Sequence, residues 1–154
     1  MKLQLSELKE TLKAQIDYIN NSIKKFEETE LELLKRATGY ASKGDVEGVK
    51  SCSLEYQELV DIKKTLSSTN EILKTVLLQL QSVEDPLDMV GKEHLAPLLK
   101  TCSRRLKIIP HVSEELEKTA EQLYKIIQTL KLPVDIAEIE RKAKQIIEEF
   151  ERKT

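Results

Sequence analysis

The 154-residue sequence has 40% hydrophobic and 34% charged residues but only four glycines, four prolines and 4% aromatic residues. This composition is typical of an all-helical, coiled-coil-like protein and argues against a compact enzyme with a deep core. The formal net charge of −2 selects neither nucleic acid nor a membrane as the partner. The sequence contains no apolar stretch of about 18 residues that could cross a bilayer.

Residues 1–83 are predicted to form two long amphipathic helices. In the first arm, apolar residues recur at intervals of three and four, which is the spacing of a helix seam: Leu5, Leu8, Leu12, Ile16, Ile19, Ile23, Phe26, Leu33, Ala37 and Tyr40. Glu30 interrupts this row once. The second arm repeats the pattern at Val46, Val49, Cys52, Tyr56, Leu59, Ile62, Leu66, Leu73, Val76, Leu80 and Val83. Two matching stripes predict an antiparallel helical hairpin.

The connection between the arms is predicted at Lys43, Gly44 and Asp45. A short connection that contains glycine closes a hairpin at little entropic cost. Asp45 is a suitable N-cap for the second arm.

Residues 84–131 are predicted to form shorter helices packed on the hairpin or hinged from it. Asp85 and Pro86 end the second arm, and Gly91 adds a second weak point. This segment is predicted to be a hinge or a single helical turn that could straighten into a longer helix in another state. A third helix is expected from Leu95 to Ile109, and a fourth is expected to open at Val112 or Ser113, with the acids Glu114, Glu115 and Glu117 in its first turn.

Residues 132–154 are predicted to form a last amphipathic helix with an autoinhibitory role. Asp135 and Glu138 make a capping-box-like start. The residues expected to pack in a closed state are Ile139, Ile146, Ile147 and Phe150. The helix either packs back on the hairpin or is released to expose apolar surface, and the short linker at Pro133 favours packing.

The sequence offers no catalytic constellation. His94 and His111 lie beside helix breaks and lack the third partner of a metal site, so we expect surface or capping roles. Cys52 and Cys102 have no CxxC context and are expected to be buried in a reducing, cytoplasmic compartment. We therefore predict a protein that is not an enzyme, holds no cofactor and binds no nucleic acid.

A row of lysines flanks the apolar seam of the first arm within an arc of roughly 80°: Lys2, Lys9, Lys13, Lys24 and Lys35. Asp17 and Glu27 lie inside this row. Two interpretations stay open. The favoured one is a solvated face that makes ion pairs on the helix surface, and the other is a membrane-facing stripe.

One stretch carries a family resemblance. The segment Leu34–Asp45, followed by Val49–Tyr56 and a second arm ending at Leu77–Val83, resembles the ESCRT-III family, and most closely its archaeal cell-division branch. The segments Leu95–Leu98 and Ile108–Gln128 are also similar to the archaeal proteins. The resemblance covers roughly residues 30–130 closely and the whole chain in architecture.

The resemblance implies a filament-forming, membrane-remodelling subunit that acts in archaeal cell division or membrane scission by regulated polymerisation. Its implied partners are copies of itself, other ESCRT-III-like subunits, an AAA ATPase and the membrane surface. Its implied location is the cytoplasm, peripheral at the membrane and at the division site. The alternative hypothesis is a coiled-coil adaptor that does not polymerise and binds another helical protein.

Overall fold

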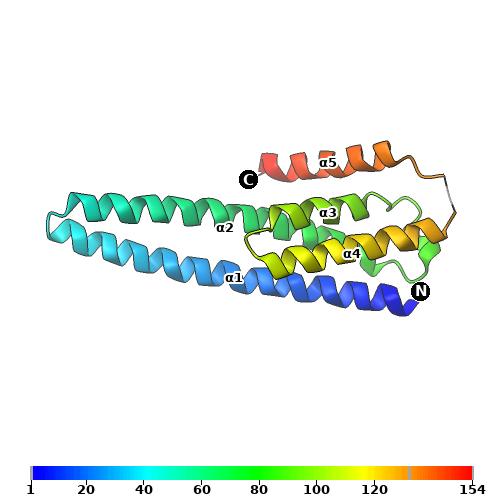
Figure 1. Cartoon of the computed structure of the whole chain (residues 1–154), viewed down its shortest axis with the longest axis horizontal. Helices are drawn as coiled ribbons and strands as arrows, with labels where there is room; N and C mark the ends of the chain where they lie inside the picture. Colours follow the sequence, from blue (N-terminus) through cyan, green and yellow to red (C-terminus); the bar gives the residue numbers. More distant parts are fainter. Residues whose placement is uncertain (1, 132, 154) are drawn as a thin grey trace. The chain divides into compact units, whose positions relative to one another are not determined.

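The computed structural model describes residues 2–131 and 133–153, and within these ranges every regular element is a helix. The elements are α1 (Lys2–Ser42), α2 (Val46–Gln81), the 3-10 helix η1 (Pro86–Met89), α3 (Leu95–Arg105), α4 (Pro110–Thr129) and α5 (Ile136–Lys153) (Figure 1). The all-α class and the two long helices are therefore confirmed. The chain forms two compact units, which we call the hairpin unit (residues 18–67) and the bundle unit (residues 1–17 and 68–154).

The hairpin unit turns at the predicted place. Gly44 adopts a positive φ of 72°, which a residue with a side chain rarely adopts. The Asp45 carboxylate accepts a hydrogen bond from the Gly48 N–H at 3.0 Å, so Asp45 caps α2 as predicted. The Tyr40 ring lies directly against Gly48, where an added Cβ would come within 2.5 Å of ring carbons. The glycine therefore allows the tyrosine to close the end of the hairpin.

Two helices alone bury the seam of the hairpin unit only in part. Ile19, Leu33, Cys52 and Leu66 are buried, whereas the other seam residues are half-buried or exposed. Val46 was predicted to lie in the seam but is 61% exposed, because it is the first residue of α2 and has only the connecting turn beside it. Glu30, the interruption in the row, is buried and faces Lys63, whose Nζ lies 3.0 Å from its Oε1.

The bundle unit surrounds its core with more helices. The beginning of α1 and the end of α2 run antiparallel here, as the hydrogen bonds from Asn70 Nδ2 to the Ile16 carbonyl and from Lys9 Nζ to the Val83 carbonyl show. Helix α3 packs against α4 and α5, and α4 also contacts η1. The resulting core has almost no exposure at Leu5, Leu8, Leu12, Leu73, Val76, Leu80, Leu98, Leu99, Leu116 and Leu123.

Two predicted helix boundaries were wrong. Helix α3 ends at Arg105 rather than Ile109, and α4 begins at Pro110 rather than at Val112 or Ser113. Ile109 is non-helical, with φ −119° and ψ 83°, because a residue that precedes proline is held out of the α conformation. Proline itself suits the first helical position, since its missing N–H would have no partner there. The acids predicted for the first turn of α4 therefore lie one turn later.

Candidate functional site

Helix α5 is held on the face of α3 by a small apolar contact. Ala143 and Ile147 are its buried residues. Of the four residues predicted to pack in a closed state, Ile147 is buried, while Ile139, Ile146 and Phe150 are half-buried. The start of α5 is fixed by Asp135, whose carboxylate accepts a hydrogen bond from the Glu138 N–H at 3.3 Å. Helix α5 is thus in a packed arrangement, but much of its apolar face keeps contact with water.

Arg105 joins three helices at the other end of α5. Its Nε donates to the Thr69 hydroxyl at 3.0 Å, and its Nη2 donates to the Ser68 hydroxyl at 3.2 Å. Its Nη1 donates to the Glu151 carboxylate on α5. Ser68 and Thr69 are buried on α2, so their hydroxyls help to orient the guanidinium that faces α5. Arg105 therefore links α2 and α3 to an acidic side chain on α5.

This network was not predicted from the sequence. The signal was the polar run Ser67–Asn70, which falls in the second arm between the seam residues Leu66 and Leu73. A polar run at buried positions needs partners, and Arg105 supplies two of the hydrogen bonds.

Space remains between α3, α4 and α5. A cavity of about 600 Å³ is lined by side chains of both charges, among them Lys100, Arg104, Glu140 and Glu148, together with Tyr124. Burial and the nearby Glu140 carboxylate raise the pKa of the Tyr124 hydroxyl. Because cationic and anionic groups share the walls, the cavity selects no single ligand charge.

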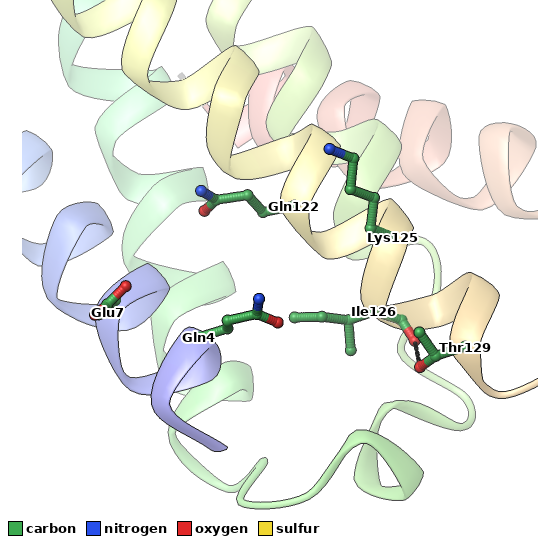
Figure 2. Close-up of a pocket in the computed structure, with 6 residues that line it drawn as sticks. All are labelled: Gln4, Glu7, Gln122, Lys125, Ile126 and Thr129. Carbon is green, nitrogen blue, oxygen red and sulfur yellow. Dashed lines mark hydrogen bonds between the residues drawn. The ribbon is translucent and has the colours of Figure 1, made fainter. Parts of the chain in front are cut away.

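A second cavity of about 470 Å³ lies between the first turns of α1 and the last turns of α4 (Figure 2). Its lining residues are Gln4, Glu7, Gln122, Lys125, Ile126 and Thr129. The Thr129 hydroxyl already donates a hydrogen bond within its own helix, to the Ile126 carbonyl at 2.6 Å. The remaining groups are exposed amides and one residue of each charge, so this cavity has no buried polar group to orient a ligand.

The predicted hinge has a defined folded conformation. Gly91 has a positive φ of 87°, and Asp85 lies just before η1, which starts at Pro86. The Asp88 carboxylate accepts hydrogen bonds from the Glu84 and Asp85 N–H groups at 3.0 and 3.1 Å, and these bonds lower its pKa. This segment is thus held by specific bonds, and straightening it would break them.

Two lysines bind the end of α2. Lys92 Nζ donates to the Gln79 carbonyl at 3.2 Å and to the Ser82 hydroxyl at 2.6 Å. Lys9 Nζ donates to the Val83 carbonyl. Cations at a helix C-terminus satisfy carbonyl groups that have no partner within the helix and oppose the negative end of the helix dipole.

The lysines of the predicted stripe differ in exposure and in their partners. Lys9 turns inward to α2, whereas Lys13, Lys24 and Lys35 are exposed. Lys13 belongs to the bundle unit, while Lys24 and Lys35 belong to the hairpin unit. The side chain of Lys2 lies outside the described part of the structure. Lys9 therefore serves the fold, and the exposed members are divided between two units.

The structure places both cysteines and both histidines of the sequence. Cys52 and Cys102 are both buried, and burial raises the pKa of the Cys102 thiol to about 12. His111 is exposed, whereas His94 is only 5% exposed and occupies the N-cap position of α3, so of the two expected roles its position fits the helix end and not the surface. The next three residues, Leu95, Ala96 and Pro97, are all buried, so the chain around His94 lies in the core. Within residues 2–131 and 133–153, no group of three or more potential metal ligands comes together.

None of the helices described is both long enough and apolar enough to cross a membrane. A scan against protein-family models, a search of curated proteins and a search of solved structures each gave no match. The interpretation of the site therefore rests on its own geometry and on the resemblance noted in the sequence.

Proposed function

We propose that this protein is a filament-forming subunit whose assembly is controlled by the release of α5 from α3. The carrying observation is that Ala143 and Ile147 are buried on α5 and that Glu151 of α5 pairs with Arg105, which also bonds to Thr69 of α2. In such a protein, contacts between subunits would compete with the contacts that hold α5 on α3.

The docking energy supports a reversible switch. Burial of the Ile147 side chain contributes about 1.5–3 kcal/mol. The ion pair adds less than about 1 kcal/mol, because the Glu151 side chain is 54% exposed. Individual contacts of this size could be replaced by contacts between subunits in a filament.

The finer part of the proposal follows the ESCRT-III resemblance. It assigns the protein to membrane remodelling in archaeal cell division or scission, as a peripheral protein at the cytoplasmic membrane surface. An AAA ATPase and related subunits would then be its partners. Two connections support this assignment. The turn at Lys43–Asp45 joins the two long helices, and the segment with Asp85, Pro86 and Gly91 leads from α2 to the shorter helices, as the resemblance implies.

A pair of matched variants tests the switch. Ile147→Glu places a charge in the buried contact with α3, whereas Ile136→Glu places the same charge at a position of α5 that is 61% exposed. Each purified protein is incubated with and without anionic liposomes, pelleted and viewed by negative-stain electron microscopy. We expect more filaments or coated tubules from Ile147→Glu than from the wild type, and no change from Ile136→Glu.

The same experiment addresses the adaptor alternative. An adaptor would stay a discrete monomer or dimer under both conditions, even with α5 released. If Ile147→Glu keeps its helical circular dichroism and still forms no assemblies, the filament proposal is wrong and the adaptor is favoured.

A further inference from the structure

His94 lies beneath the start of α5. It occupies the N-cap position of α3 and is 5% exposed. A cavity of about 230 Å³ brings it together with Pro133 and Val134 of the connection to α5, and with Ile139 and Lys142 of α5 itself. When α5 and its connection leave, the imidazole therefore loses one wall of its surroundings and gains contact with water.

Three features of the docked arrangement disfavour a positive charge on the His94 imidazole. Burial removes the water that would solvate the charge. Lys142 faces the same cavity from α5 with a charge of the same sign. The N-terminus of α3 adds the positive end of a helix dipole.

Acidic groups also face the cavity: Glu93 from the same segment as His94, Asp135 from the connection and Glu138 from α5. Glu93 favours the charged imidazole, but burial and then Lys142 have the larger effect, and the pKa of His94 is lowered. The docked state therefore holds His94 in its neutral form.

We propose that His94 makes the docking of α5 sensitive to acid, because the imidazole takes up a proton more readily after α5 has left. This inference rests on the release of α5 that the proposed function requires, and it adds the condition that triggers release. It predicts that a fall in pH moves the protein towards its assembly-competent state.

The sign follows from linkage between proton binding and docking. Above the ordinary histidine pKa of about 6.5, both states are neutral at His94 and the pH has no effect through this group. Below that value the released state binds a proton at His94 more readily than the docked state, in which the pKa of His94 is lowered. The docked fraction then falls by up to about tenfold per pH unit, until the pH reaches the lowered pKa of the docked state.

The test measures hydrogen exchange of the α5 backbone amides in the full chain between pH 8 and pH 5, corrected for the intrinsic exchange rate at each pH. We expect protection of α5 to fall about three- to tenfold from pH 7.5 to pH 5.5 in the wild type. His94→Gln should abolish this fall. The matched control is His111→Gln, which replaces the exposed histidine and should leave the fall unchanged.

A second variant protects the test against misfolding of His94→Gln. Lys142→Gln changes an exposed side chain and removes the charge that faces the imidazole. The docked and released states then differ less in proton affinity, so the fall in protection should be smaller. A flat wild-type profile would overturn the inference, as would an undiminished fall in both His94→Gln and Lys142→Gln.

The readout also separates this inference from the proposed function. Acid release of α5 without filaments at any pH would contradict the filament proposal alone. Filaments from Ile147→Glu, combined with α5 protection that does not depend on pH, would contradict the His94 inference alone.

Discussion

The hairpin unit and the bundle unit share one sequence pattern, but they bury its apolar residues to different degrees. In the hairpin unit the seam residues Ile23, Phe26, Leu59 and Ile62 are half-buried. In the bundle unit the equivalent residues of the same helices, such as Leu12 and Leu73, are fully buried. The difference arises because a two-helix seam stays open to water along its edges, while α3 and α4 add further helices to the bundle unit. Periodicity thus specifies which residues face inward, and the number of neighbouring helices decides how deeply they are buried.

The two units also accommodate polar seam residues differently. In the hairpin unit, Glu30 and Lys63 form an ion pair whose side chains are 11% and 29% exposed, so water still reaches it. In the bundle unit, the buried hydroxyls of Ser68 and Thr69 are satisfied by the Arg105 guanidinium. The open seam tolerates a charged pair, whereas the enclosed core uses neutral groups bonded to one anchored cation.

The largest predicted difference between the units comes from truncated leucines. Leu73→Ala in the bundle unit should lower the free energy of unfolding by about 2–5 kcal/mol, because it leaves a cavity in a closed core. Leu59→Ala in the hairpin unit should cost only roughly 1 kcal/mol, because part of the side chain is already in water. Urea unfolding followed by circular dichroism measures both. Equal losses would mean that the two seams are equally closed.

The ion pair of the hairpin unit gives the next largest effect. Glu30→Ala should cost about 1–3 kcal/mol, since it leaves the Lys63 ammonium partly buried without its acceptor. The control is Glu55→Ala, which removes an exposed partner 3.7 Å from Arg36 and should cost less than about 0.5 kcal/mol. Hydrogen exchange of amides in residues 18–67 localises the loss. If the two variants behave alike, the buried pair contributes no more than a surface pair.

Two glycines of the hairpin unit should respond in opposite directions. Gly39→Ala meets no atom within 4 Å and should stabilise α1 by up to about 1 kcal/mol through helix propensity. Gly48→Ala should destabilise the unit despite the same gain in propensity, because its Cβ would overlap the Tyr40 ring. Thermal unfolding of both variants, and of Gly48→Ala combined with Tyr40→Ala, checks the cause. Removal of the ring should return Gly48→Ala to the behaviour of Gly39→Ala.

The smallest effect is a dependence on alkaline pH that belongs to the hairpin unit. The hydrogen bond to Glu30 raises the pKa of Lys63 above its usual 10.5. A raised pKa stabilises the folded state below 10.5, and this contribution is lost as the pH rises through the folded-state pKa. Protection of residues 18–67 should therefore fall above pH 10.5 more steeply in the wild type than in Lys63→Met. Lys64→Met, which alters an exposed neighbour, should follow the wild type.

Local patterns predicted most of the fold, and their failures have physical causes. The first helix and the turn depend only on neighbours in sequence, so both could be predicted. Their signals are the spacing of Leu5, Leu8 and Leu12 and the turn residues Gly44 and Asp45. The start of α4 was misplaced because Pro110 can stop one helix or open the next, and only the packing of α3 against α4 decides between these roles.

The candidate site was less predictable because its contacts join distant residues. Arg105 lies 36 residues from Thr69 and 46 from Glu151, and no local pattern pairs them. Lys9 was grouped with a surface stripe on the basis of helix geometry, yet it bonds to Val83, 74 residues away. His94 was expected to have a surface or capping role because it lies beside a helix break, and the buried residues after it explain why it is buried at the N-cap position of α3. Periodicity gives the face of a residue on its helix, whereas its partner depends on tertiary structure.

Because both native cysteines are buried, they should react only slowly with thiol-specific reagents. With a pKa of about 12, the Cys102 thiol is ionised in only about one molecule in 100,000 at pH 7. Cys52 is shielded by the seam of the hairpin unit, at 5% exposure. A maleimide dye should therefore react with a single new cysteine on the exposed surface of α5 far faster than with either native thiol. The departure of α5 from α3 can then be followed by fluorescence without removing a natural cysteine from either core.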